Sequence, residues 1–158
     1  MTNQKITPCL WFDSQAEEAA NFYTSIFKDS KIENISRYGK EGFEIHGQKE
    51  GTVLTVDFQI NGQPFTALNG GPVFKFNESV SFQIFCATQE EIDFHWSKLT
   101  ADGGEEGECG WLKDKFGLSW QVSPTILTKL MSDPTKADKV MKVLLQMKKL
   151  DIEKLMQA

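Results

Sequence analysis

Cysteine, histidine and long apolar runs are all scarce in this chain of 158 residues. Its three cysteines, Cys9, Cys86 and Cys109, are too few and too scattered for a disulfide framework, and their spacing matches no zinc pattern. No apolar run approaches the roughly 20 residues of a membrane span. The N-terminal segment MTNQKITPCLWF lacks the cationic and apolar regions of a signal peptide. These absences predict a cytoplasmic protein that does not enter a membrane.

Positive charge is also in the minority. Lys and Arg number 17 against 22 Asp and Glu, which leaves a formal net charge of −5. A chain without a basic excess has no electrostatic attraction for the phosphates of nucleic acid or for an anionic membrane surface. We therefore expect neither as a partner.

The composition that remains is that of an ordinary globular protein. Hydrophobic residues make up 40% of the chain and charged residues 25%, both close to the globular average. The length suits one domain, or a fused pair of small modules, with a substantial core. Twelve Phe and four Trp supply more large rings than core packing needs, so some of them are candidates for a binding surface.

The first half of the chain shows the element order β-α-β-β-β. Two-residue alternation predicts the strands, and a 3.6-residue period predicts the helix, with Asp13 or Ser14 as its N-cap. Asn61-Gly62 is the strongest hairpin signal, because both residues tolerate the backbone of a tight turn. The half ends near Gly71-Pro72. Its expected elements are a strand at 5–12, a helix at 13–27, a strand at 29–39, a polar loop at 40–51, a strand at 52–60 and a returning strand at 63–70.

The same order begins again after this point. Residues 79–87 alternate as a strand, and Thr88 with Glu91 three residues later is a capping-box signature that opens a helix. Strand material at 108–114, a short turn and a strand at 118–123 complete the half. Two halves of the same order predict a duplicated βαβββ unit and an α+β fold.

From Pro124 onward the sequence becomes helical, so residues 124–158 are expected to form a C-terminal helical extension. Ser123 and Asp133 each precede a proline, as an N-cap precedes the first helical residue. The residues expected to form one buried apolar stripe are Met141, Leu144, Leu145, Met147 and Leu150.

Three segments carry a family resemblance: ITPCLWFDSQAEEAANFYTSIF, GQPFTALNGGPVFKFNESVSF and CGWLKDKFGLSWQVSPTIL. Together they resemble the PhnB-like branch of the glyoxalase/bleomycin-resistance (vicinal oxygen chelate) superfamily, whose members often bear the label 3-demethylubiquinone-9 3-methyltransferase. The resemblance runs from about Lys5 over nearly the whole chain. It implies one glyoxalase-like domain at 1–123, built from two βαβββ modules at 5–72 and 79–123. Each module would curve a sheet around a cleft, commonly within a homodimer.

The resemblance also implies where a metal would bind. The positions that hold His, Gln or Glu in metal-dependent relatives correspond here to Thr7, Asn69, Ser81 and Gln121. Hydroxyls and amides are poor ligands without a carboxylate or imidazole partner. The histidines, His46 in the polar loop and His95 in the second helix, are expected to be surface or locally bonded side chains. We therefore expect no metal site and no cofactor.

Two residues of the first half are candidates for catalysis. Cys9 shares a strand face with Thr7, but a reactive thiol needs a nearby cation or helix N-terminus, and a buried structural thiol is the alternative. Asp57 lies on the polar face of its strand, where it is either a general base or substrate anchor, or an ordinary solvent-facing carboxylate.

Aromatic rings complete the expected cleft. Trp11, with Phe58 or Phe85, would line it beside the amides and hydroxyls, which suits a small and partly apolar ligand. The alternative is a module interior filled by side chains. Trp120 alternates with Gln121 and is expected to pack under the helices.

A methyltransferase activity has no support in the motifs. The one glycine-rich stretch, at 68–72, is followed by VFKFNES, which is not a helix, so a turn explains it better than a nucleotide-binding loop. The leading hypothesis is a metal-independent protein that binds a small organic molecule. The alternatives are a metal-dependent lyase, isomerase or dioxygenase with an atypical site, and a dimeric interaction module.

Overall fold

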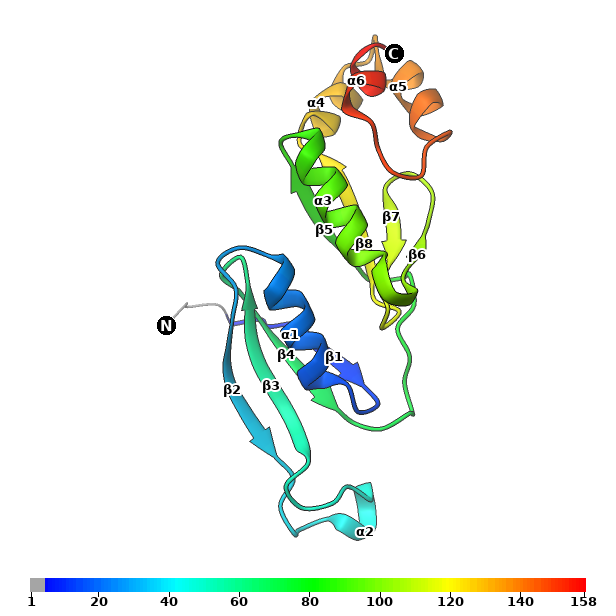
Figure 1. Ribbon diagram of the computed structural model, residues 1–158. Helices are drawn as coiled ribbons and strands as arrows, with labels where there is room; N and C mark the ends of the chain where they lie inside the picture. The colour runs from blue at the N-terminus through cyan, green and yellow to red at the C-terminus, as the bar shows by residue number, and fades with distance from the viewer. Residues whose placement is uncertain (1–4) are drawn as a thin grey trace. The chain divides into compact units, whose positions relative to one another are not determined.

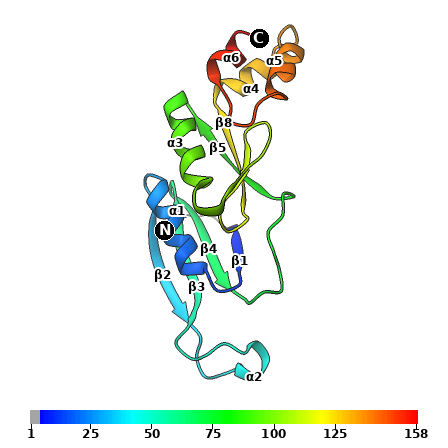
Figure 2. The same ribbon diagram turned by 45° about the vertical axis from the view of Figure 1, so that its right-hand side comes forward.

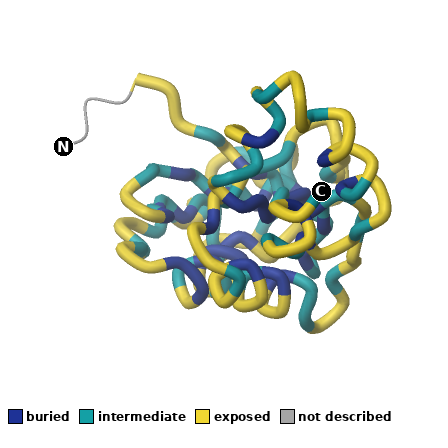
Figure 3. Tube along the Cα trace, turned by 90° about the horizontal axis from the view of Figure 1, so that it is seen from above, coloured by how far each residue is buried: buried dark blue, intermediate teal, exposed yellow. Residues whose placement is uncertain are grey.

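The computed structural model describes residues 5–158 (Figure 1). The chain forms two compact units, Met1–Lys75 and Phe76–Ala158, each with one four-stranded sheet. Buried, intermediate and exposed residues are interspersed along the chain (Figure 3), and buried residues alternate with intermediate ones from Thr55 to Ile60, as in a two-sided sheet. Within residues 5–158, no helix is both long enough and apolar enough to cross a membrane.

The first unit has the predicted β-α-β-β-β order, with a one-turn helix added in the polar loop. Its sheet has the strand order β1-β4-β3-β2, in which β1 is parallel to β4 and the other pairs are antiparallel. Pairing of the first strand begins at Cys9, so that strand is shorter than the expected 5–12. The elements are β1 (Cys9–Phe12), α1 (Ala16–Ile26), β2 (Lys31–Arg37), α2 (Phe43–His46), β3 (Val53–Ile60) and β4 (Gln63–Asn69).

Helix α1 covers one face of this sheet (Figures 1 and 2). The ring of Tyr23 stacks on Phe58, and Phe58 stacks on Phe65, with ring centroids 6.2 and 5.5 Å apart. All three side chains are buried. The prediction that Phe58 lines a cleft is therefore wrong, because strand alternation turns it toward the helix.

The hairpin between β3 and β4 turns at Asn61-Gly62, as predicted. Both residues have positive φ, 48° and 74°, and Ile60 pairs directly with Gln63. This two-residue turn sets the register of the whole β3–β4 pair.

The second unit repeats the order around a sheet β5-β8-β7-β6, in which β5 is parallel to β8. The Thr88 cap is confirmed: its hydroxyl accepts a hydrogen bond from the Glu91 N–H at 3.3 Å. The Glu91 carboxylate accepts a hydrogen bond from the Ala87 N–H at 2.6 Å, one residue before the N–H that a capping box uses. Trp120 is buried, as its alternation with Gln121 predicted. The elements are β5 (Ser81–Cys86), α3 (Gln89–Leu99), a 3-10 turn (Ala101–Gly103), β6 (Glu105–Glu106), β7 (Trp111–Lys113) and β8 (Ser119–Pro124).

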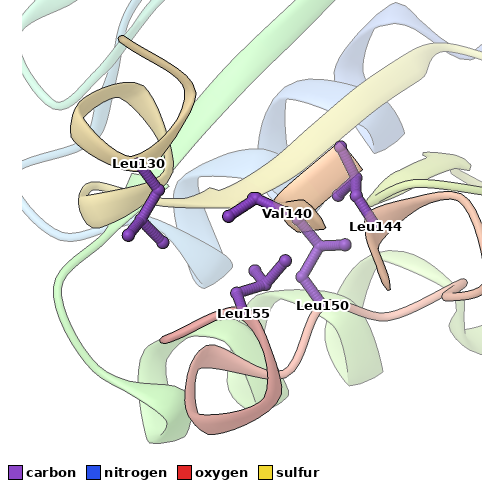
Figure 4. Packing of buried hydrophobic residues seen from close by; sticks show 5 residues of the cluster. All are labelled: Leu130, Val140, Leu144, Leu150 and Leu155. Carbon is purple, nitrogen blue, oxygen red and sulfur yellow. The ribbon is translucent and has the colours of Figure 1, made fainter. Parts of the chain in front are cut away.

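Three short helices form the extension: α4 (Ile126–Ser132), α5 (Ala137–Leu144) and α6 (Ile152–Met156). They enclose a small apolar cluster (Figure 4) made of Leu130, Val140, Leu144, Leu150 and Leu155. The predicted stripe is correct for Leu144 and Leu150. It is wrong for Met141 and Leu145, which are exposed. Met141 lies within α5 but off the face that buries Val140 and Leu144, and Leu145 follows the end of that helix.

The two residues predicted as helix N-caps in the extension, Ser123 and Asp133, do not cap its helices. Ser123 lies within β8, and α4 starts after Thr125. Asp133 instead forms a turn, its carboxylate accepting hydrogen bonds from the Thr135 N–H and hydroxyl at 2.9 and 2.7 Å.

The extension is joined to the second sheet by backbone hydrogen bonds. The N–H groups of Cys109 and Gly110 donate to the carbonyls of Met147 and Lys148 at 2.7 and 2.8 Å. The side chain of Gln89, at the start of α3, binds the Leu150 carbonyl and the Ile152 N–H. The extension is therefore part of the second compact unit.

Candidate functional site

The face of the first sheet opposite α1 carries both predicted catalytic candidates. Cys9 on β1 pairs with Thr66 on β4, and Thr66 pairs with Asp57 on β3, so the three side chains form one row across three strands. The Thr66 hydroxyl donates a hydrogen bond to the Asp57 carboxylate at 2.8 Å. Sequence analysis missed Thr66, although the two-residue hairpin places it opposite Asp57.

The thiol in this row is a weak nucleophile. Cys9 as a whole is exposed, but its thiol is partly buried, and this burial is the main reason why the thiol pKa is raised. The negative charge of Asp57 raises the same pKa further. The attacking species is the thiolate, so a raised pKa lowers reactivity at neutral pH. All three cysteines are free, and burial raises the pKa of Cys86 to about 11.

Trp11 lies on the same face, closer to the end of the sheet. Its indole N–H donates to the Gly71 carbonyl at 2.8 Å, and its ring meets Phe74 edge-on with centroids 4.9 Å apart. A Cβ atom at Gly70 would lie 2.2 Å from this ring, so only glycine fits there. Trp11 is thus held in one orientation and remains half-buried.

Asn69 and Thr7 lie outside the row formed by Cys9, Thr66 and Asp57. Asn69 is buried on the helix side, where its Oδ1 accepts a hydrogen bond from the Ala16 N–H at 2.8 Å and its Nδ2 donates to the Val53 carbonyl at 3.1 Å. It supplies the cap of α1 that was predicted for Asp13 or Ser14. Thr7 is exposed and precedes β1.

In the second unit, parallel pairing of β5 with β8 brings Ser81 and Gln121 together. The Gln121 amide donates to the Ser81 hydroxyl at 2.8 Å and accepts a weaker hydrogen bond from Gln83 at 3.4 Å. Phe85 shares this face and is 57% exposed. We call Ser81, Gln83 and Gln121 the amide row. Gln83, which sequence analysis did not single out, could have been found from its alternation with Ser81.

The turn that precedes Gln121 is structural. The buried Asp114 carboxylate accepts hydrogen bonds from the Phe116 and Leu118 N–H groups at 2.9 and 3.1 Å and from the Trp120 indole N–H at 2.9 Å. These bonds hold the charged turn against the start of β8. They therefore help to fix the position of Gln121, which follows Trp120 in that strand.

The histidines are engaged locally, as predicted. His46 Nδ1 accepts a hydrogen bond from the Gln48 N–H at 2.9 Å, and the His46 ring packs on Tyr38. His95 Nδ1 lies 2.9 Å from the Glu91 carbonyl. In the described part of the chain, no three His, Cys, Asp or Glu side chains converge as metal ligands would.

The glycine-rich stretch at 68–72 is an exit turn from β4. Its Gly70 and Gly71 N–H groups donate to the carbonyls of Phe12 and Asp13 at 2.9 and 3.1 Å, so they are not directed at a phosphate. No helix follows it. Both observations agree with the interpretation of this stretch as a turn.

Comparisons with known proteins give the family. Residues 4–123 match the family model described as 3-demethylubiquinone-9 3-methyltransferase. A PhnB protein from Bacillus cereus is 40% identical, with 77% of this chain and all of that chain covered and a TM-score of 0.68.

More distant structures share the fold alone. A protein from Pseudomonas aeruginosa is 16% identical over 77% of this chain and 98% of its own, with a TM-score of 0.59. The fosfomycin resistance protein FosX from Listeria monocytogenes is 13% identical over 82% and 98%, with a TM-score of 0.53. The search of curated proteins gave no match. The chain belongs to the 3-demethylubiquinone-9 3-methyltransferase family, the PhnB-like branch of the vicinal oxygen chelate superfamily.

Proposed function

We propose that this protein binds a small organic ligand without a metal ion, on the open sheet faces of its modules. The observation that carries the proposal is the amide row. At the position where the resemblance implies a metal-binding carboxylate, Gln121 is neutral and already hydrogen-bonded to Ser81. An amide offers one donor and one acceptor group, which suits recognition of a polar, uncharged ligand group better than coordination of a cation.

The remaining predicted cleft residues offer further contacts in each unit, taken separately. Phe85 offers an exposed apolar ring beside the amide row. In the first unit, Trp11 offers a ring held in place by its bond to Gly71, and Asp57 offers a carboxylate oriented by Thr66. On either unit, a ligand with an apolar body and a few hydrogen-bonding groups would match the surface. Thr7 and Asn69 belong to the proposed cleft by family resemblance only, and the Asn69 amide is engaged on the helix side.

We do not extend the proposal to methyl transfer. A donor nucleotide needs free backbone N–H groups at a glycine-rich loop, and those of Gly70 and Gly71 are used within the fold. Nor do we assign Cys9 as a nucleophile, because its raised pKa keeps the thiol protonated at neutral pH. Asp57 is retained as a ligand anchor and as the candidate base, should the bound ligand be turned over.

The proposal includes a cytoplasmic homodimer, as the family resemblance implies. Exposed apolar side chains such as Val73 and Val80 are consistent with a surface that a second copy covers. Light scattering of the full chain tests this part: a mass of one chain at micromolar concentration contradicts it.

The ligand proposal is tested by screening a fragment library with ligand-observed NMR on protein treated with EDTA. We expect hits that bind without added metal and that are lost in Gln121→Ala. Asn21→Ala is the matched control, since it removes an exposed amide from α1, which covers the other face of the first sheet, and it should retain the hits. Hits that appear only after a divalent metal is added would favour the metalloenzyme alternative, and an absence of hits would remove support for a binding function.

A further inference from the structure

A cavity of about 220 Å³ lies in the second unit, beside strands β6, β7 and β8. The amide row takes no part in it, since none of Ser81, Gln83 and Gln121 lines it. The lining residues that matter for recognition are Glu78, Glu105, Glu106, Trp111, Lys113 and Ser119.

The cavity wall has an excess of negative charge, with three carboxylates against one ammonium group. Lys113 forms an ion pair with Glu78 and pairs with Glu105 across β6 and β7. The hydrogen bond with Glu78 is the main reason why the pKa of Lys113 is raised and that of Glu78 is lowered. Both groups therefore stay charged at neutral pH, and the single cation of the wall is already neutralised by a carboxylate.

A buried hydroxyl without a partner also faces this site. Ser119 is 1% exposed, and its Oγ is the one buried side-chain oxygen or nitrogen, within residues 5–158, that has no hydrogen-bond partner. It lines the cavity between its cross-strand neighbours Lys113 and Ser81. A buried polar group without a partner is destabilising, so a ligand that bonds to it gains affinity.

The wall suits an organic cation better than a metal ion. Its carboxylates come from the segment before β5 and from β6, and no three acidic, histidine or cysteine ligands converge in the described residues. Because the carboxylates are spread along the wall, they match an organic cation, which is larger than a metal ion, better than they match a metal ion. Trp111 adds an indole, the ring that binds organic ammonium groups best.

We propose that this cavity binds a small organic ammonium compound, with Glu105 and Trp111 facing its cationic group and Ser119 bonding to its hydroxyl or carbonyl oxygen. Glu106 adds negative charge, although one of its oxygens accepts a hydrogen bond from the Trp96 indole N–H at 2.7 Å. The inference goes beyond the proposed function, because it uses side chains outside the amide row and stands whether or not that row binds a ligand.

Calorimetric titration of the full chain tests the site, with choline as the probe. Its uncharged isostere 3,3-dimethylbutan-1-ol is the control, since the two differ only in the charged atom. We expect choline to bind at least about 10-fold more tightly than the alcohol, as a charge-assisted contact should. Equal binding of the two compounds, or no saturation by choline up to roughly 10 mM, overturns the proposal.

Variants assign the residues. Glu105→Gln should weaken choline binding by about 10-fold and Ser119→Ala by about 5-fold, the usual cost of one lost charge contact and one lost hydrogen bond. Glu90→Gln removes the same charge from an exposed site on α3 and should leave binding within about 2-fold. Gln121→Ala should also retain choline binding, which separates this site from the proposed ligand cleft.

Protein stability distinguishes lost binding from lost folding. Since the Ser119 hydroxyl has no partner, Ser119→Ala should melt at or above the wild-type temperature while binding choline more weakly. Wild-type affinity in both Glu105→Gln and Ser119→Ala would sink the assignment.

Discussion

The side chain of Asn69 accepts a hydrogen bond from the backbone N–H of Ala16, 53 residues earlier in the chain, at 2.8 Å. The last residue of β4 thus caps the first turn of α1. The same amide donates to the Val53 carbonyl at 3.1 Å, so one side chain joins the helix, the end of β4 and the start of β3.

Asn69→Ala should therefore lower the free energy of unfolding by about 1–3 kcal/mol, from the lost cap and a partly buried carbonyl left without this partner. Urea denaturation measures this loss. Asn21→Ala is the control: its amide also bonds to backbone, but on the exposed side of α1, and it should change stability by less than about 0.5 kcal/mol. Equal losses in the two variants would contradict a capping role for Asn69.

Gly70→Ala should disturb Trp11. The added methyl group would lie 2.2 Å from the indole, so the ring must move and give up its bond to Gly71. We expect a loss of about 1–3 kcal/mol, typical of overpacking, and a shift in tryptophan fluorescence. Gly39→Ala, where nothing lies within 4 Å of the new atom, should leave both measurements unchanged.

The pH dependence of alkylation at Cys9 should move with the charge of Asp57. Burial and this carboxylate raise the thiol pKa, so the alkylation rate of the wild type should rise only above the pH at which an unperturbed thiol ionises. Asp57→Asn removes one of the two causes, and its rate profile should shift to lower pH. The profile is measured by mass spectrometry after timed iodoacetamide treatment.

Asp102→Asn is the control for this experiment, because Asp102 belongs to the second unit and does not contribute to the Cys9 pKa. Identical profiles in the wild type and Asp57→Asn would show that burial alone sets the pKa of Cys9.

Gln89→Ala should loosen the C-terminal extension. The Gln89 side chain donates to the Leu150 carbonyl at 3.0 Å and accepts from the Ile152 N–H at 2.9 Å. Loss of both bonds should lower stability by about 1–3 kcal/mol and speed hydrogen exchange from residue 145 to the end of the chain. Gln157→Ala, whose amide bonds only within the exposed side of α6, should leave that exchange unchanged.

Local chemistry was enough to predict much of the fold. The Asn61-Gly62 turn, the Thr88 cap and the two rounds of strand alternation each depend on residues a few positions apart, so the sequence alone indicated the repeated β-α-β-β-β order. The errors also have local causes. The expected stripe failed at Met141 and Leu145 because α5 buries the face of Val140 and Leu144, one position earlier in the helical register.

The candidate sites needed the tertiary structure. Cys9 and Asp57 become neighbours of Thr66 only through the pairing of β1, β4 and β3, and Gln121 meets Ser81 only through the parallel pairing of β5 with β8. Parallel strands are joined by long crossovers whose register no local motif specifies.

The sequence by itself determined which residues alternate, turn and cap, because these depend on backbone preferences over a few residues. Tertiary structure alone decided that Asn69 caps a helix, that Asp114 holds a turn and that Ser119 is left unbonded in a cavity. Each of these roles depends on which distant group lies within hydrogen-bond reach, and only the packed sheets decide that.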